Sequence, residues 1–168
     1  MNNQDKSLLV KTVVENVVSS IKSQCGDKMT LDLALKLCEA VKQKAKEMGV
    51  NAVVAVADAG ANPICVQCMN DAYIASYDIA VNKAFTSVSL KMPTSALREL
   101  AAPGGSLYGI QFTNNGKIVI FGGGVPLYDR NGNIIGGLGV SGGSEPQDDA
   151  LGDYGGEAFN KIINNEGV

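Results

Sequence analysis

Histidine is absent from the 168 residues of this sequence, and that absence limits the chemistry the chain can perform. Without an imidazole there is no Ser-His-Asp triad, no Cys-His dyad and no histidine ligand for a metal ion. General acid–base catalysis would fall to Asp, Glu, Lys, Tyr or Cys side chains with shifted pKa values. No convincing pair of this kind stands out. We therefore expect no catalytic residue, and a binding function is favoured over an enzymatic one.

The four cysteines are the next candidates for chemistry, and two of them, Cys65 and Cys68, have the C-x-x-C spacing. A redox motif places its first cysteine at a helix N-terminus, whereas these two lie in a predicted strand. Residues three apart in a strand point to opposite faces, which suits neither chelation of one ion nor a local disulfide. Adding Cys25 and Cys38 gives no common zinc spacing. We predict free thiols and no metal site.

Glycines concentrate around one predicted strand pair, at Gly122-Gly123-Gly124, Gly136-Gly137, Gly139 and Gly142-Gly143. Glycine lets a ligand or another backbone approach closely, and its exposed N–H groups can hold a carboxylate or a phosphate. The same residues also form bulges and tight bends. For the triple glycine, both interpretations stay open.

Two charged residues complete the candidate binding site. Lys83 is the single charge on a helix face of small residues, so it is either an exposed rim residue or an anchor for an anionic ligand. Asp148 follows the predicted helix start at Ser144, where it either complements the helix dipole or supports a ligand. The predicted ligand-binding residues are Met69, Lys83, Gly122, Gly123, Gly124 and Asp148.

These residues must be positioned by alternating helices and hairpins. Helical periodicity and capping signals predict helices over residues 6–22, 30–48, 73–90, 94–100 and from 144 onward. Apolar runs bounded by turn residues predict strands over 52–57, 63–69, 118–121, 125–128 and 134–140. Strands joined by hairpins indicate an α+β fold. We expect a five-stranded, largely antiparallel sheet with packed helices.

The helix over 73–90 has two unlike faces. Its predicted core stripe consists of Ile74, Tyr77, Val81, Phe85 and Val88. The opposite face carries Ala72, Ser76, Ala80, Lys83 and Ser87, which are mostly small. Small residues indicate that another backbone packs closely there. We predict a second buried face, most simply a contact between copies of the chain.

Bulk composition excludes several classes of partner. Hydrophobic residues make up 45% and charged residues 18% of the chain, which is typical of a globular protein, and the formal net charge is −3. A negative chain is not drawn to nucleic acid or to anionic lipid. No apolar run approaches the ~18–20 residues of a membrane span, and no secretory signal begins the chain. We expect a cytoplasmic protein.

The chain divides into an N-terminal amphipathic helix with its linker, residues 1–28, and a domain over residues 29–168. The helix either caps the core of the domain or forms a detachable arm.

Three segments together resemble the GlcG/HbpS family of haem-binding proteins, which also occurs as the C-terminal domain of PduO. They are Val53–Asp58 with Gly60; Met69–Ala72 running into Asp78–Ala80, Lys83-Ala84 and Lys91–Thr94; and Gly122–Pro126 with Gly132, Ile135-Gly136, Gly139–Gly143 and Gln147-Asp148. The resemblance covers about residues 30–159. It implies a five-stranded α+β domain with the layer architecture of profilin-like and PAS-like folds. It also implies assembly into dimers or larger oligomers such as octamers, and haem or another tetrapyrrole as ligand.

The resemblance also implies a setting in glycolate, diol or glycerol metabolism and in bacterial microcompartments, whose shell the arm over residues 1–28 would target. The family's usual Arg-Met-Asp-Gly-Ala reads Cys68-Met-Asn-Asp-Ala72 here, and no histidine is available to hold haem iron.

We expect a homo-oligomeric binding protein. The alternatives are a non-catalytic cargo or structural protein of a microcompartment, and a small enzyme acting on a diol- or aldehyde-derived substrate.

Overall fold

The computed structural model describes residues 11–14 and 28–164. Residues 11–14 are helical; the remainder of the helix predicted over 6–22, and the linker up to residue 27, lie outside the described residues. The described chain begins its main domain with helix α2 (Leu31–Glu47) and strands β1 (Val53–Asp58) and β2 (Pro63–Cys68). It continues with helix α3 (Ile74–Leu90), the 3₁₀ turn η1 (Thr94–Ala96), α4 (Leu97–Leu100), η2 (Ile110–Phe112), η3 (Asn114–Gly116), β3 (Gly124–Tyr128), β4 (Ile134–Ser141) and α5 (Glu145–Ile163).

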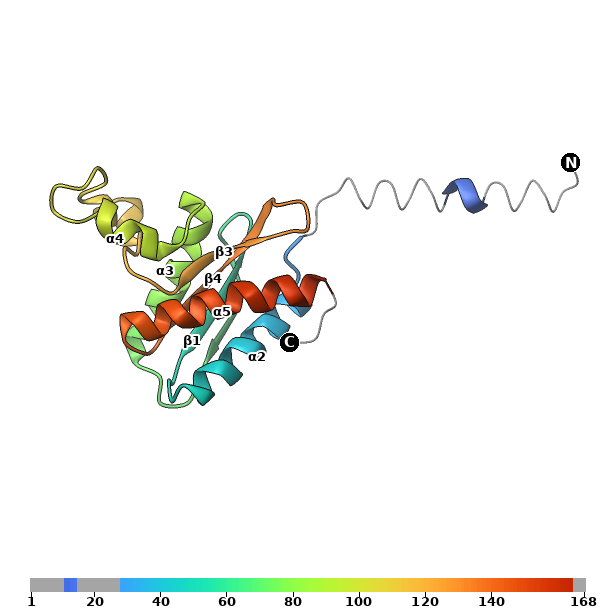
Figure 1. Ribbon diagram of the computed structural model, residues 1–168, viewed down its shortest axis with the longest axis horizontal. Coiled ribbons are helices and arrows are strands. Elements are labelled where there is room, and N and C mark those ends of the chain that lie inside the picture. Colours follow the sequence, from blue (N-terminus) through green and yellow to red (C-terminus); the bar gives the residue numbers. More distant parts are fainter. Residues whose placement is uncertain (1–10, 15–27, 165–168) are drawn as a thin grey trace, which may run out of the picture.

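The described strands form one antiparallel sheet in the order β2-β1-β4-β3. Helices α2 and α5 lie side by side over one face, and α3 covers the other (Figure 1). The larger apolar core lies between the sheet and the α2–α5 layer, and a smaller one lies between β1 and α3. The α+β architecture with packed helices is confirmed.

Local capping signals placed most element boundaries correctly. Thr30 caps α2 by accepting a 3.3 Å hydrogen bond from the Leu33 N–H, and Gly49 follows that helix with a φ of 68°. At the start of α5, the Ser144 N–H donates to Gln147 Oε1 at 2.9 Å, as the predicted capping box requires. Such signals depend only on neighbours within a few residues, so they can be seen in sequence.

The predicted strand over residues 118–121 was wrong, so the described sheet has four strands rather than five. This segment pairs with no described strand and instead contacts α3 through the Thr86 side chain. The Val119 N–H donates to Thr86 Oγ1 at 3.0 Å, and that hydroxyl lies 3.2 Å from the Lys117 carbonyl oxygen. The Thr86 hydroxyl thus takes the place of a partner strand for the N–H group of Val119.

The predicted core stripe of α3 was wrong at the start of the helix, although Val88 is buried and Val81 packs against the smaller core. Ile74 is 97% exposed and Tyr77 is 54% exposed. The small face is buried against the sheet, through Ser76, Ala80, Lys83 and Ser87. A Cβ atom on Gly139 of β4 would lie 2.0 Å from the Ala80 carbonyl oxygen, so the backbones of helix and strand are in direct contact. Close backbone packing was correctly predicted, but the neighbour is the chain's own β4 rather than a second copy.

Candidate functional site

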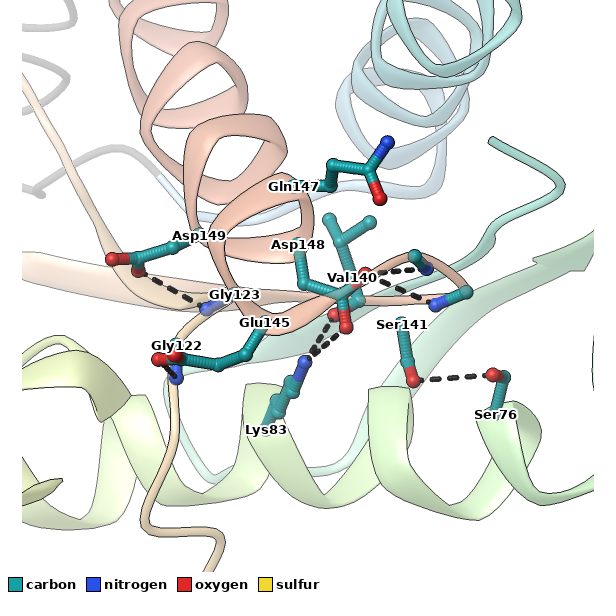
Figure 2. Close-up of polar contacts among 12 residues, drawn as sticks. Ser76, Lys83, Gly122, Gly123, Val140, Ser141, Glu145, Gln147, Asp148 and Asp149 are labelled. Carbon is teal, nitrogen blue, oxygen red and sulfur yellow. Dashed lines mark hydrogen bonds and ion pairs between the residues drawn. The ribbon is translucent and has the colours of Figure 1, made fainter. Parts of the chain in front are cut away.

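A buried ion pair joins both faces of the sheet. Lys83 of α3 is fully buried, and its Nζ lies 2.8 Å from Asp148 Oδ2 and 2.8 Å from the Val140 carbonyl oxygen (Figure 2). Asp148 belongs to the first turn of α5, and its side chain is 5% exposed. Burial lowers the pKa of Lys83 from its ordinary value, while the hydrogen bond and charge of Asp148 act in the opposite direction.

The second carboxylate oxygen of Asp148 binds backbone. Its Oδ1 accepts hydrogen bonds from the Gly142 N–H at 3.1 Å and the Gly143 N–H at 2.9 Å. We call Lys83, Asp148, the Val140 carbonyl and these two N–H groups the Lys83–Asp148 cluster. It connects α3, the end of β4 and the start of α5, so it fixes how these three elements lie relative to one another. The sequence-predicted Lys83 is therefore an internal anchor and not an exposed rim residue.

The triple-glycine loop lies directly against this cluster, as Figure 2 shows. Each of its N–H groups donates to a side-chain oxygen of the chain itself: Gly122 to Glu145 at 3.1 Å, Gly123 to Asp149 at 3.2 Å, and Gly124 to Thr94 at 2.9 Å. Glu145 also pairs with Arg98. The loop does cradle carboxylates, but they come from α5.

Close packing explains why this loop is glycine. Gly123 has a φ of 107°, a conformation that favours glycine. A Cβ atom there would lie 2.8 Å from Lys83 Nζ and 3.0 Å from Asp148 Cβ. The structure thus brings five of the six predicted residues together, namely Lys83, Gly122, Gly123, Gly124 and Asp148.

Met69 lies apart from the cluster. It follows β2, its Sδ accepts a 3.4 Å hydrogen bond from the Ala52 N–H, and it is half-buried against the larger core. It also borders a groove of about 470 Å³ between α2 and the end of β2. Within the described residues, no hydrogen bond joins Met69 to the Lys83–Asp148 cluster, so the six predicted residues do not form one pocket.

Exposed aromatic side chains mark surfaces that the sequence did not single out. Tyr73, Ile74 and Tyr77, at the start of α3, are 71%, 97% and 54% exposed, and we call them the α3 patch. Tyr108 and Phe112, on the long connection between α4 and β3, are also largely exposed. Exposed apolar patches of this kind mark contacts with ligands or proteins. The apolar stripe of α3 is the signal in the sequence, and helical periodicity alone places that stripe in the core.

Few side chains among the described residues are placed to act as donors to a metal ion or a cofactor. No group of three or more Cys, Asp or Glu side chains is placed to hold a metal ion within residues 11–14 and 28–164. Lys83 and Met69 already have internal partners. The exposed donors include the phenols of Tyr73 and Tyr77. Across the same ranges, no helix is both long and apolar enough to cross a membrane.

The sequence of this chain matches a known protein family. The profile of the HbpS-like family, described as haem-degrading protein HbpS-like, matches residues 29–155. The chain belongs to the HbpS-like family. A Citrobacter freundii relative, a 15.0 kDa protein in the dhaT-dhaS intergenic region, is 43% identical over 84% of this chain and 99% of its own length. The corrinoid adenosyltransferase PduO of the same organism is 34% identical over 83% of this chain, which corresponds to 43% of PduO.

Solved structures of HbpS-like proteins share this fold. The Klebsiella pneumoniae protein ORFY superposes with a TM-score of 0.76 at 41% identity, covering 79% of this chain and 90% of its own. The complex of PduOC with haem also gives a TM-score of 0.76, at 36% identity, covering 80% of this chain and 96% of PduOC. The family match and these two structures together confirm the resemblance to the HbpS family and to PduOC.

Proposed function

We propose that this HbpS-like chain is a homo-oligomeric protein that binds haem or a related tetrapyrrole, as an accessory to glycolate- or diol-type metabolism in bacteria. The observation that carries the proposal is its likeness to PduOC, which was solved with haem and whose length it covers almost completely. The match to two-fifths of PduO supports the metabolic setting. The proposal does not extend to adenosyl transfer, because the chain matches less than half of that enzyme.

The α3 patch is the surface that best suits such a ligand. A tetrapyrrole has two broad apolar faces, and Tyr73, Ile74 and Tyr77 present exposed apolar area at one end of α3. Where histidine is missing, a tyrosine phenolate can serve as an axial ligand of haem iron. When bound, haem would supply the redox and ligand-binding chemistry of its iron. The chain would supply the apolar surface, the phenol donors and a rigid support.

The Lys83–Asp148 cluster provides that support. Lys83 projects from α3 to the opposite side of the sheet, so the ion pair holds the helix that carries the patch. We propose that Lys83, Asp148 and the triple glycine act by positioning α3. Met69 stays a separate candidate contact, in the groove beside α2.

Hemin titration tests the proposal. The wild-type chain is expected to give a saturable shift of the Soret band, and Tyr77→Phe or Tyr73→Phe is expected to weaken binding about tenfold or more if that phenol holds the iron. Tyr128→Phe, a partly exposed tyrosine on β3, is the matched control and should bind as wild type. Met69→Ala, in the same assay, tests whether the groove beside α2 contributes to hemin binding. A parallel titration with a cobalamin tests whether the chain binds that related ligand instead.

Absence of a saturable shift with both ligands would contradict the binding proposal. The cargo alternative would then lead, and it has its own test. The family profile matches from residue 29, so residues 1–28 lie outside the matched domain. If they form a targeting arm for a microcompartment, deletion of Met1–Gln24 should abolish co-localisation with shells without unfolding the domain.

We expect the exposed face of α3, the same face that carries the proposed ligand surface, to take part in self-association as well, since the small-residue face is already buried. Ile74→Glu places a charge at a side chain that is 97% exposed, so it should leave the fold intact and shift the particle mass toward monomer by light scattering. Leu31→Glu, on an exposed leucine at the start of α2, is the matched control and should keep the wild-type mass. A monomeric wild type at micromolar concentration would refute this assembly.

A further inference from the structure

Two buried cysteines from different elements meet inside the larger core. Cys38 of α2 is fully buried, and Cys65 of β2 is 9% exposed. Their Sγ atoms lie 3.7 Å apart, within reach of a thiol hydrogen bond. The proposed haem site uses neither residue, and 26 residues separate them in the chain. The pair thus connects the helix to the outer edge of the sheet, because β2 is an edge strand.

The C-x-x-C spacing draws attention to Cys65 and Cys68, but the contact in the structure is between Cys65 and Cys38. Cys68 is exposed while Cys65 is buried, so the two cysteines of the string occupy opposite faces of β2, as predicted. The true neighbour of Cys65 is Cys38, which only the packing of α2 on the sheet brings close. The separation of 3.7 Å between the two Sγ atoms must shorten to about 2 Å when a disulfide forms.

We propose that Cys38 and Cys65 form a site of two-electron oxidation, at which a hydroperoxide converts the two thiols into a disulfide between α2 and β2. The sulfur of Cys65, on the edge strand, attacks the peroxide and becomes a sulfenic acid, with release of one water from hydrogen peroxide. The sulfur of Cys38 then displaces the sulfenic oxygen, which leaves as a second water. Two thiols are oxidised, and one peroxide is reduced to two waters.

Burial sets the conditions under which this step proceeds. Desolvation, followed by the proximity of Cys65, raises the pKa of the Cys38 thiol well above its usual range. A raised pKa leaves little of the reactive thiolate, so the step is slow with any oxidant. Burial also shields the sulfur from bulky or charged reagents, so the oxidant must be small and uncharged. The exposed thiol of Cys68 provides an internal comparison, since it is open to reagents of any size.

The disulfide would act on the groove beside Met69. That groove is lined by α2 residues, including Glu39 and Lys42, and by Cys68 and Met69 at the end of β2. Each cysteine of the pair lies on one of the two elements that form its walls. Oxidation would therefore fix the distance between these walls and tie the edge strand to the helix.

Peroxide treatment of the full chain tests the proposal. After acid quenching and alkylation under denaturing conditions, peptide mapping should show Cys38 joined to Cys65, a mass lower by two hydrogens, and recovery of both thiols with dithiothreitol. The crosslink closes a loop of the unfolded chain, so the Tm of the oxidised protein should rise by about 5 °C.

Variants separate this site from the other cysteines. Cys68→Ser should keep the crosslink and the rise in Tm, whereas Cys38→Ser should lose both. Cys65→Ala is a second test if Cys38→Ser folds poorly. A disulfide that instead involves Cys25 or Cys68, or peroxide treatment of the folded chain that adds only oxygen to the thiols, would overturn the proposal. Either result would leave the haem proposal unaffected, because the α3 patch contains no cysteine.

Discussion

Replacing Lys83 with methionine is expected to lower the free energy of unfolding by about 3–5 kcal/mol. Methionine fills much of the same volume, so the loss comes from the charge rather than from a cavity. The carboxylate of Asp148 would stay buried without its cation, and the Val140 carbonyl would lose its donor. Breaking one partner of a buried pair is costly because the other charge is left uncompensated. Guanidinium unfolding followed by circular dichroism measures the change.

Two further variants show whether the charge is the cause. Lys83→Met combined with Asp148→Asn removes both charges, and the new amide oxygen can still accept from the Gly142 and Gly143 N–H groups, so the double variant should be more stable than Lys83→Met alone. Lys42→Met breaks a surface pair with Glu39, which is 72% exposed, and should cost less than about 1 kcal/mol. If Lys83→Met costs no more than Lys42→Met, the ion pair does not anchor α3.

The sequence identified Lys83 but could not settle its role. Its position among small residues on one helix face was visible, and both an exposed rim and a ligand anchor were compatible with that pattern. The partner, Asp148, lies 65 positions away and meets Lys83 only through packing across the sheet. The same holds for the pairing of Cys38 with Cys65. Local signals predicted the helices and hairpins, because caps and turns depend on neighbouring residues, whereas long-range pairings depend on topology.

Helix α3 packs on the sheet through its small residues rather than through its predicted apolar stripe, and this has a specific physical cause. Periodicity assigns the larger apolar side chains to the core, and that rule placed Ile74 and Tyr77 inside. Here β4 carries glycines where the helix crosses it, so the closest packing is reached with small residues on both surfaces. The sequence shows the glycines of β4 and the small-residue face of α3 as two separate features. Only the folded structure shows that these two surfaces pack together, which leaves Ile74 and Tyr77 exposed.

Adding one methyl group at Gly139 should therefore be among the most damaging changes in the domain. The Cβ atom of Gly139→Ala would lie 2.0 Å from the Ala80 carbonyl oxygen and 2.6 Å from the Ala84 N atom, both backbone atoms that cannot rotate away. Helix α3 must move as a unit, which would also pull Lys83 from Asp148. We expect a loss of about 3 kcal/mol or more in the free energy of unfolding, at the upper end of typical overpacking effects.

Gly156→Ala is the matched control, because it adds the same methyl group where the nearest atom, a methyl carbon of Val125, is 3.7 Å away. Alanine is also the better helix former within α5, so this variant should be neutral or more stable by up to about 1 kcal/mol. Thermal and guanidinium unfolding of the Gly139→Ala and Gly156→Ala variants measures the difference in their free energies of unfolding. Equal stability of the two variants would show that α3 can shift away from β4 without cost. In that case, the close contact between the small residues of α3 and Gly139 would not determine which face of α3 is exposed. The exposed α3 surface, on which binding and self-association are proposed, would then lose its structural basis.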